Sequence, residues 1–500
     1  MKLLGVVASN STATYAPLLV NETNEREVKE EQLVVIEDNS RSLKYLGVIR
    51  RVMRLDTFLL PYRRTAYADN PDLVGEGSAC FGQAYIYLVG IISNGSLEEV
   101  TIPPNPGSKV YSIENSNEID LNLGEGLVVG VHKYSGLEVP LQPEYLFYHV
   151  AVIGSTGTGK SRLVKALVDE ILEKTDYSVI IFDHTGVDYS NYYPEHVVKS
   201  SEIILDPEIL AELILSKTKL YRERQTYEKY YLLAILHYLL SRTRLVKGNN
   251  LEYFATGKVA NVLSMVENMD FTELLRKMEE GIEWTVKDFK ESIKAVFHEL
   301  MSRRVSESAR IRALLSIDLK LGKPFFDNLS QRRILPERIV ERSLEDQLVV
   351  VDMSHDMDLV VKRYIVSSIL SSIWKIIEEN KKPLKIIAVV DEAHNYASEA
   401  AYGVVEDIER IAREGRKWGY GIILATQRIM DIAPKIRGNI NTVFFSRLQT
   451  QNDFRELSGF INLGGIDESS LAILGKREFY VAGLMNPLKI PMLLKVKEVS

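Results

Sequence analysis

The feature that most constrains this chain is a glycine-rich segment between an apolar run and a helical repeat. His149–Ile153 is apolar enough to form a short buried strand of a parallel sheet. The residues that follow, 154–161, read GSTGTGKS and fit the pattern G-x-x-x-x-G-K-[ST] of a phosphate-binding loop. Apolar residues then recur at helical spacing, at Leu163, Leu167, Val168 and Ile171. The segment therefore has the strand–loop–helix context that the motif requires.

The residue types of this loop suit a ligand with several phosphate groups. Its glycines allow the backbone to curl, so that successive N–H groups and the helix N-terminus form a cradle for an anion. Lys160 would reach the β- and γ-phosphates, and the Ser161 hydroxyl would bind Mg²⁺. We therefore expect ATP and Mg²⁺ as cofactors; a glycine-rich connection without a ligand is the alternative. The predicted nucleotide-binding residues of the loop are Gly154, Gly157, Thr158, Gly159, Lys160, Ser161 and Arg162.

Composition narrows the class of protein. A chain of 500 residues is long enough for several domains with their own cores. Its net charge of −7 argues against indiscriminate coating of nucleic acid or anionic membrane, and leaves room for a local basic channel. Cys80 is the only cysteine, which excludes an intrachain disulfide and a thiol-rich metal site. No signal-peptide core or membrane span stands out, so we expect a soluble, cytoplasmic protein.

The predicted fold class is α/β: a RecA-like P-loop ATPase core with a helical insertion, preceded by a small β-barrel. Residues 1–140 contain short apolar runs between turn-rich segments, which is typical of a small barrel or sandwich. We assign 141–204 and 346–500 to the core and 205–345 to the insertion. The expected barrel strands are Leu3–Val7, Leu33–Ile36, Tyr45–Val52, Ala84–Ile92 and Gly126–Val131.

Core strands and helices alternate along the chain, which predicts a mostly parallel sheet with right-handed crossovers. Beyond the phosphate loop, the expected strands are Ser178–Phe182, Gln347–Met353, Leu384–Glu392, Gly421–Arg428 and Asn441–Ser446, with a helix over Asp358–Asn380. Ligands of such sheets bind at the carboxyl ends of the strands, where Asp183, Asp391 and Gln427 all fall.

Within the insertion, a tyrosine-rich stripe between Lys217 and Arg244 could stack bases, but its helical spacing favours packing in a core. The pairs Arg303–Arg304 and Arg332–Arg333 are interpreted as solvated helix faces.

Asp391 and Glu392 follow an apolar strand and form the second nucleotide signature. Asp391 would hold Mg²⁺ through its hydration shell, and Glu392 would polarise the attacking water. The Gln427 amide could bridge this water and the γ-phosphate. Asp183 is either an acid near the site or a plain strand cap. An N-K-x-D guanine motif is absent from the sequence, which argues against a GTPase.

A guanidinium delivered from outside the site can stabilise the charge that spreads over the γ-phosphate oxygens. Arg416 is our candidate, because the neighbouring Gly415 would let the chain bend and expose it; Arg413 is its substitute. The alternative is a surface salt bridge to Glu406 or Glu409.

These motifs together resemble the HerA branch of the HerA–FtsK family of DNA-translocating ATPases. The resemblance rests on GSTGTGKS (154–161), VVDEAH (389–394), RIAREGRKWGYG (410–421) and ATQR (425–428), with the β-rich region in front. It implies a barrel, a RecA-like core, a homohexameric ring, double-stranded DNA as substrate, and a partner nuclease of the NurA type. It also implies that Arg416 acts in the site of a neighbouring subunit, and that Lys495 and Val496 near the C-terminus contact nucleotide.

Two positions depart from the family pattern. Tyr148 stands where an arginine is common, and residues 183–189 read DHTGVDY where the family tends to have D-x-H-G-E-Y. Our hypothesis is an ATP-driven translocase or helicase that acts in DNA end processing and repair, with Lys160, Glu392, Gln427 and Arg416 as catalytic residues. A conjugation- or pilus-type pump for DNA or protein, and a nucleotide-sensing scaffold without motor activity, are the alternatives.

Overall fold

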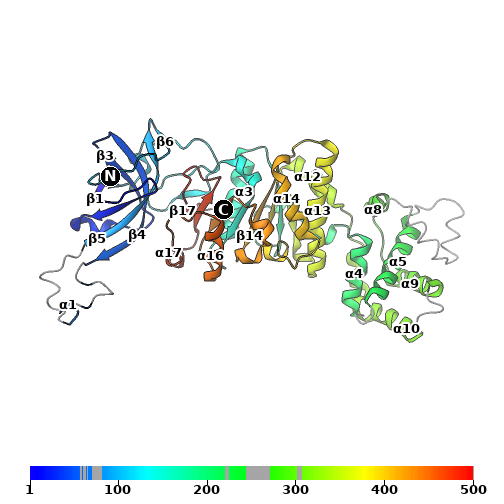
Figure 1. The fold of residues 1–500 in the computed structure, drawn as a ribbon. Helices are drawn as coiled ribbons and strands as arrows, with labels where there is room; N and C mark the ends of the chain where they lie inside the picture. The colour runs from blue at the N-terminus through cyan, green and yellow to red at the C-terminus, as the bar shows by residue number, and fades with distance from the viewer. Residues whose placement is uncertain are drawn as a thin grey trace. The chain divides into compact units, whose positions relative to one another are not determined.

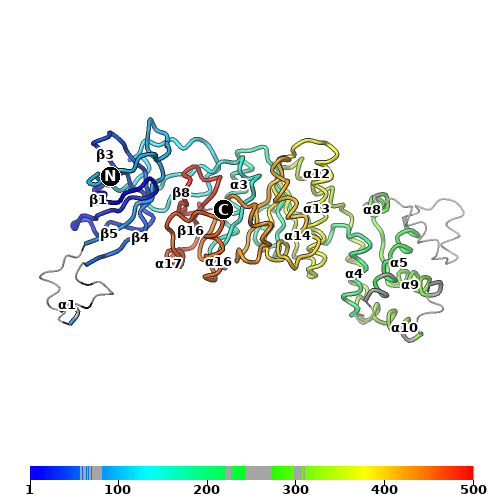
Figure 2. Tube along the Cα trace, in the orientation of Figure 1, coloured from blue at the N-terminus to red at the C-terminus, as the bar shows by residue number. Residues whose placement is uncertain are grey.

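The computed structural model describes residues 1–56, 59, 64, 66–69, 81–219, 224–243, 271–300 and 307–498. The chain divides into two compact units. Unit 1 comprises Met1–Tyr177 and Gly421–Ser500, and unit 2 comprises Ser178–Tyr420. Figures 1 and 2 trace the described helices and strands of each unit.

Unit 1 begins with a closed antiparallel barrel (Figure 1). Its sheet has the order β2-β1-β7-β3-β4-β5-β6, and a further pairing of β2 with β5 closes the ring. Apolar side chains of alternate positions fill the interior, among them Leu4, Leu18, Ile36 and Ile86, which are fully buried. The strands are β1 (Lys2–Val7), β2 (Tyr15–Val20), β3 (Leu33–Asp38), β4 (Leu43–Leu55), β5 (Phe81–Ser93), β6 (Ser96–Glu98) and β7 (Lys109–Ser112). The predicted barrel is therefore confirmed.

One expected barrel strand is wrong. Over 126–131 only the last residues are extended, as part of β8 (Gly130–His132), and β8 pairs antiparallel with β17 (Met492–Val496) instead of with a barrel strand. Gly130 permits this pairing, since a Cβ there would lie 2.3 Å from the carbonyl oxygen of Lys495. Two strands that the sequence analysis did not predict, β2 and β7, complete the barrel.

The rest of unit 1 places the phosphate loop. β9 (Val150–Ile153) lies between the parallel strands β14 (Tyr420–Thr426) and β15 (Thr442–Phe445), and β16 (Glu478–Gly483), β17 and β8 continue from β15 as antiparallel strands. α3 (Lys160–Lys174) follows the loop. The shorter helices are α15 (Pro434–Arg437), α16 (Gln451–Phe460) and α17 (Glu468–Ala472).

A buried arginine connects the barrel to the strands around the loop. Arg50 of β4 is 2% exposed, and its guanidinium is paired with the buried Glu31 at 2.9 Å. It also donates to the carbonyl oxygens of Leu463, Gly464 and, at 2.6 Å, Pro491. The buried N–H groups of the guanidinium thus donate to oxygen atoms. These bonds offset the cost of burying the positive charge in unit 1.

Unit 2 contains four parallel strands in the order β11-β12-β10-β13. They are β10 (Ser178–Asp183), β11 (Val197–Lys199), β12 (Leu348–Asp352) and β13 (Ile386–Val390). β10, β12 and β13 are buried along their whole length, and even Asp352 at the end of β12 is only 8% exposed. Fully buried parallel strands read as continuous apolar runs, which explains why the sequence located them well.

Helices make up the remainder of unit 2. Between β11 and β12 lie α4 (Pro207–Thr218), α5 (Arg224–Thr243), α8 (Phe271–Glu279), α9 (Val286–Leu300), α10 (Glu307–Ser316), a π-helical turn (Ile317–Leu321), α11 (Gly322–Leu329) and α12 (Pro336–Asp346). After β12 come α13 (Leu359–Asn380) and α14 (Val404–Glu414). α4, α5, α8, α9 and α10 gather in one bundle (Figure 1).

The tyrosine stripe of α5 packs in this bundle, as the sequence predicted. Tyr227, Tyr231, Leu233 and Leu236 are all less than 9% exposed, and Tyr238 stacks on Trp284 with ring centroids 4.6 Å apart. Leu220, which belongs to the same predicted stripe, lies outside the described residues. The predicted fold class, a RecA-like α/β core with a helical insertion and a barrel in front, is confirmed; the residue boundaries assigned to the domains stay predictions.

The interpretation of Arg332 as part of a solvated helix face is wrong. Arg332 precedes α12, is 5% exposed, and pairs with Asp356 at 2.6 Å. Its Nη1 also donates to the carbonyl oxygens of Ser200 and Ile203, so the charge ties the chain before α12 to the turns after β11 and β12. Arg333 is exposed as expected, and Arg303–Arg304 lie outside the described residues. Among the described residues, none of the helices is both long enough and apolar enough to cross a membrane.

Candidate nucleotide-binding site

The phosphate loop of unit 1 forms the turn that its sequence predicts. Gly157 and Gly159 have φ angles of 81° and 103°, a left-handed conformation that L side chains rarely adopt. Gly159 caps the N-terminus of α3, so the loop runs directly into the positive end of the helix dipole. Two internal bonds brace the loop: Thr158 Oγ1 donates to the Ser155 carbonyl at 2.8 Å, and Lys160 Nζ donates to the Gly154 carbonyl at 2.9 Å.

The predicted phosphate-contacting groups are accessible at the start of the helix. Lys160, Ser161 and Arg162 are half-buried and follow one another on the first turn of α3, whereas Thr158 is fully buried and serves the loop's internal bonding. At Gly154 a Cβ would come within 2.7 Å of Thr158 Oγ1, so glycine is required for this packing. A backbone of this shape presents N–H groups to an anion.

Gln427 lies next to the loop. It directly follows β14, and its Oε1 accepts hydrogen bonds from Thr156 Oγ1 and Gln449 Nε2, each at 3.1 Å. Because Thr156 is exposed within the loop, this bond joins the loop to the end of the neighbouring strand. The structure thus brings Gln427 and the loop together, as its predicted role requires; the role itself stays a prediction.

Val496 on β17 is linked to the phosphate loop through one intervening residue, Arg477, and Lys495 is bonded to the residue before it. The Val496 N–H donates to the Arg477 carbonyl at 2.9 Å, and the Arg477 N–H donates to the Thr158 carbonyl at 2.8 Å. Lys495 Nζ donates to the Lys476 carbonyl at 2.9 Å. β17 is therefore hydrogen-bonded to the segment that backs the phosphate loop, and direct nucleotide contacts of these two residues stay a prediction.

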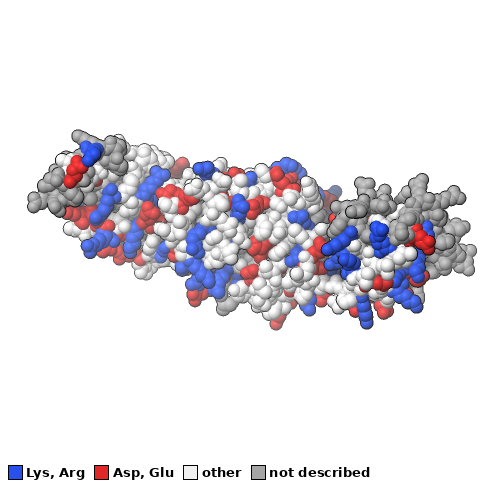
Figure 3. Space-filling model, turned by 90° about the horizontal axis from the view of Figure 1, so that it is seen from below, with Lys and Arg blue, Asp and Glu red and all other residues white. Residues whose placement is uncertain are grey.

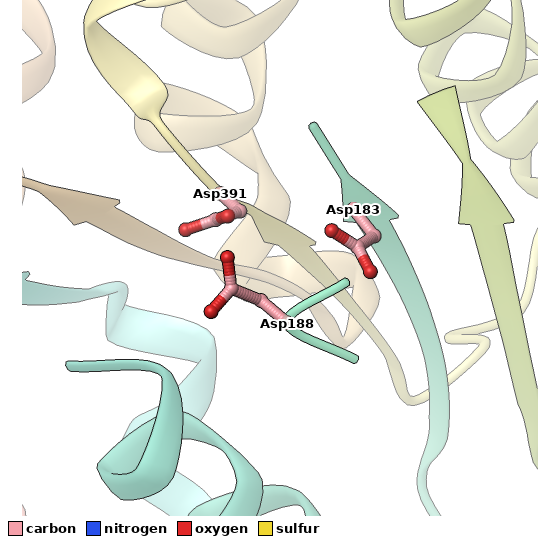
Figure 4. Close-up of side chains that lie close together, drawn as sticks. All are labelled: Asp183, Asp188 and Asp391. Carbon is pink, nitrogen blue, oxygen red and sulfur yellow. The ribbon is translucent and has the colours of Figure 1, made fainter. Parts of the chain in front are cut away.

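Unit 2 contains a cluster of three carboxylates at the ends of its strands. Asp183 ends β10, Asp391 follows β13, and Asp188 lies on the turn after β10; one oxygen of each lies within 4.8 Å of the others. Figure 4 shows the carboxylates of Asp188 and Asp391 turned toward one another, with Asp183 beside them. A set of carboxylate oxygens alone is the donor chemistry that Mg²⁺ prefers, so these residues fit that ion.

The electrostatics of Asp391 favour a cation nearby. Burial is the main cause that raises the pKa of Asp391 to about 8, and the neighbouring carboxylates of Glu392 and Asp188 act in the same direction. A divalent cation would offset this repulsion and keep Asp391 ionised. Asp391 as a magnesium ligand, with Ser161 of unit 1 as the second predicted ligand, stays a prediction.

Asp183 caps its strand, one of the two roles that the sequence left open. Its Oδ1 accepts from the Gly186 N–H at 2.9 Å, and its Oδ2 accepts from the N–H groups of Tyr189 and Ser190 at 2.9 Å each. These bonds fold the segment after β10 back on itself. As a result Asp188 is brought toward Asp391, which lies on another strand.

Glu392 has an unusual backbone for its type. Its φ and ψ of 46° and 48° are left-handed, and such strain in a residue other than glycine clusters at functional sites. Its side chain is one-quarter exposed, and Oε2 lies 3.2 Å from His394 Nδ1. Nearby, His184 Nδ1 and the Tyr396 hydroxyl are hydrogen-bonded at 2.7 Å, and burial lowers the pKa of His184. Glu392 thus lies beside Asp391 in a turn that also contains the His394 imidazole.

The structure corrects our expectation of a bend at Gly415. Gly415 has helical φ and ψ of −60° and −36°, and the chain continues from α14 into a short 3-10 helix, Gly415–Trp418. Glycine is required there for a different reason, since a Cβ would lie 2.3 Å from the Tyr420 carbonyl oxygen. The turn comes at Gly419, with φ of 61°. Arg416 is exposed on the 3-10 helix, as predicted, and Arg413 is paired with Glu414 at 2.7 Å.

Comparison with known families finds one matching family model. Residues 127–373 match the family described as helicase HerA, central domain. Residues 127–373 are therefore similar to a HerA central domain. The matched segment includes the phosphate loop, the strand-end aspartates Asp183 and Asp352, and the helical insertion, whereas Asp391 lies outside it. The resemblance to HerA that the motifs predicted is confirmed.

Relatives extend the similarity to HerA beyond the matched domain. The chain is 26% identical to the DNA double-strand break repair helicase HerA of Sulfurisphaera tokodaii, over 81% of this chain and 75% of the relative. It is also 26% identical to a probable helicase of Methanocaldococcus jannaschii, over 82% of this chain and 78% of that protein. Among solved structures, VirB4 of Thermoanaerobacter pseudethanolicus superposes with a TM-score of 0.45 and 15% identity, covering 76% of this chain and 98% of that chain.

Four residues, three near the phosphate loop of unit 1 and one in the carboxylate cluster of unit 2, escaped the sequence analysis. Gln449 lies four residues after the end of β15 and donates to Gln427, so the rule that ligands of a parallel sheet bind near its strand ends indicates the segment but not the residue. Asp188 lies several residues after its strand and reaches the cluster only because Asp183 folds the turn. Thr156 belongs to a variable position of the motif, and Arg477 belongs to no motif.

Proposed function

We propose that this protein is an ATP-driven motor that moves double-stranded DNA through a ring of six identical subunits. The observation that carries the proposal is the phosphate loop: two left-handed glycines, Lys160 and the α3 N-terminus form an anion cradle between β9 and α3. Similarity to proteins named DNA double-strand break repair helicases supports DNA as the substrate and DNA end processing as the setting.

In this mechanism each residue has a separate role in phosphoryl transfer. The loop N–H groups and Lys160 bind the phosphates, and Ser161 and Asp391 hold Mg²⁺, which would neutralise charge that develops on the γ-phosphate. Glu392 accepts a proton from the attacking water, and Gln427 orients that water against the γ-phosphate. Arg416, exposed on its 3-10 helix, stabilises the transition state in the site of the neighbouring subunit.

The charge distribution supports a polyanionic partner despite the net charge of −7. Figure 3 shows Lys and Arg side chains gathered locally on the visible face, interspersed with Asp and Glu. Local basic clusters bind DNA phosphates with release of counterions, so the logarithm of the affinity for duplex DNA should fall linearly with the logarithm of salt concentration. We further propose a partner nuclease of the NurA type and a cytoplasmic location.

The test compares ATP turnover with and without blunt duplex DNA for the wild type and for Glu392→Gln. We expect DNA to stimulate the wild type, and we expect Glu392→Gln to bind ATP but lose turnover. Binding of ATP with negligible turnover in the wild type, with or without DNA, would instead indicate a nucleotide-sensing scaffold. A Glu392→Gln protein with wild-type turnover would remove Glu392 from the mechanism.

A further inference from the structure

Arg477 lies directly against the phosphate loop of unit 1. It precedes β16, and its backbone N–H donates to the Thr158 carbonyl at 2.8 Å. A Cβ built on Gly159 would lie 3.3 Å from Arg477 Cγ and 3.6 Å from Arg477 N. The arginine side chain therefore starts beside the last glycine of the loop, next to the N-terminus of α3.

The backbone of Arg477 has a strained conformation, so a function of the side chain would explain why arginine and not glycine stands there. Its φ of 64° is left-handed, where glycine would be relaxed and arginine is not. Hydrogen bonds on both sides hold this conformation, because the Arg477 N–H is bonded to Thr158 and the Arg477 carbonyl accepts from the Val496 N–H at 2.9 Å. The anchoring of the loop needs only these backbone groups, which glycine would supply equally well.

The guanidinium of Arg477 has a replaceable partner. Its Nη2 donates to Glu498 Oε1 at 2.8 Å, the Arg477 side chain is 20% exposed, and the Glu498 side chain is 85% exposed. An ion pair with so exposed a carboxylate contributes little to stability, because water solvates the carboxylate almost as well. Phosphate groups, which arginine binds bidentately, are stronger ligands for the same fork of N–H groups.

We propose that Arg477 is a further nucleotide-binding residue, whose guanidinium contacts the phosphates of the nucleotide that the loop binds, in competition with the carboxylate of Glu498. The inference rests on the proposed binding of nucleotide by the loop. It adds a cation that lies more than 300 positions from the phosphate-loop motif, at the start of a strand that the motif does not include. Glu498 then acts as a mild internal competitor of nucleotide.

The experiment measures the dissociation constant of the fluorescent nucleotide mant-ADP with Mg²⁺, for the full chain and its variants. Arg477→Gly removes the guanidinium, keeps the N–H that holds Thr158, and relaxes the backbone, so loss of binding would not reflect loss of fold. We expect Arg477→Gly to bind at least about fivefold more weakly, and Glu498→Gln to bind equally well or more tightly. The double variant Arg477→Gly with Glu498→Gln should bind mant-ADP like Arg477→Gly alone, because without the guanidinium Glu498 has no phosphate-binding group to pair with.

Lys489→Gly is the matched control. Like Arg477, Lys489 is a cation of unit 1 with a left-handed φ, here 60°, but Lys489 is exposed and its N–H donates to the Asn486 carbonyl and not to the loop. Binding by Arg477→Gly within about twofold of the wild type and of this control would overturn the inference. Equal weakening in Arg477→Gly and Glu498→Gln would also overturn it, because the pair would then be only a structural brace. A wild type that binds no mant-ADP would overturn the proposed function itself, and this inference with it.

Discussion

Thr156 Oγ1 donates to Gln427 Oε1 across 3.1 Å, so a residue at the tip of the phosphate loop is bonded to the residue that follows β14. A nucleotide that occupies the loop would compete for Thr156 and free the Gln427 amide. Gln427 is then well placed to report which phosphates the loop holds.

We predict that Gln427→Ala lowers kcat for ATP hydrolysis by about 100-fold with little change in KM, because a group that orients water acts mainly in the transition state. Steady-state turnover against ATP concentration measures both constants. Gln449→Ala is the control, since it removes the other partner of Gln427 Oε1 and keeps the bond from Thr156. A large rise in KM at unchanged kcat would assign Gln427 to ground-state binding instead.

Asp391→Asn should separate stability from activity. Burial and neighbouring carboxylates raise the pKa of Asp391 to about 8, so its native state binds a proton more tightly than its unfolded state, for which the ordinary value is 3.8. In EDTA, the wild type should therefore gain stability as pH falls from about 9 to about 6. The asparagine side chain carries no charge, and we expect this pH dependence to shrink in the variant.

The same substitution should raise the free energy of unfolding at about pH 9 in EDTA, by at most about 6 kcal/mol, because the pKa of Asp391 rises from 3.8 to about 8 and each pKa unit corresponds to about 1.4 kcal/mol. Thermal unfolding with and without Mg²⁺ checks both statements, and turnover checks the loss of activity. If Asp391→Asn were less stable than the wild type at this pH, the carboxylates around Asp391 would not repel it in the native state.

Gly415→Ala should destabilise unit 2 by about 1–3 kcal/mol, because the new methyl group would meet the Tyr420 carbonyl oxygen 2.3 Å away. Gly459→Ala in α16 is the matched control, since a Cβ there has no described atom within 4 Å. That change should stabilise the protein by roughly 0.5–1 kcal/mol, as alanine is the better helix former. Urea unfolding of both variants measures the difference, and equal effects would contradict the close contact at Gly415.

Arg50→Ala should cost about 3–5 kcal/mol of stability, because it leaves the buried Glu31 carboxylate without its cation. Burial already raises the pKa of Glu31, so protonation favours the native state and the loss should diminish as pH falls from about 8 to about 5. Arg54→Ala is the control: Arg54 also pairs with a glutamate, Glu25, but is two-thirds exposed, so its loss should cost less than about 1 kcal/mol. Denaturant titrations at several pH values test this, and a pH-independent loss would count against the buried charge as its cause.

The sequence was most informative where burial and periodicity agree. β10, β12 and β13 are buried on both faces and read as apolar runs, and α13 follows the predicted Asp358–Asn380 almost residue for residue. The phosphate loop was recognisable because its glycines and its lysine have fixed spacing. In contrast, β2 contains Pro17, which weakens the strand signal, and yet pairs with both β1 and β5.

The residues that the sequence misassigned depend on tertiary contacts. The sequence around Arg332 is polar, as on a protein surface. Arg332 is nevertheless buried, and its charge is compensated there by Asp356. Gly415 resembles a hinge, but the nearby Tyr420 carbonyl explains the glycine. Asp188 reaches Asp391 because Asp183 folds the intervening turn, and no spacing rule contains that information.

The proposed motor requires a catalytic centre that two subunits share, with Glu392 from one subunit and Arg416 from the next. The decisive measurement mixes two inactive variants, Glu392→Gln and Arg416→Ala, and follows ATP turnover on duplex DNA after subunit exchange. Where an Arg416→Ala subunit supplies the pocket and a Glu392→Gln neighbour supplies the arginine, the site is complete, so we predict recovered turnover in the mixture. Turnover in the mixture no higher than in either variant alone, with exchange shown by mass, would contradict a shared centre.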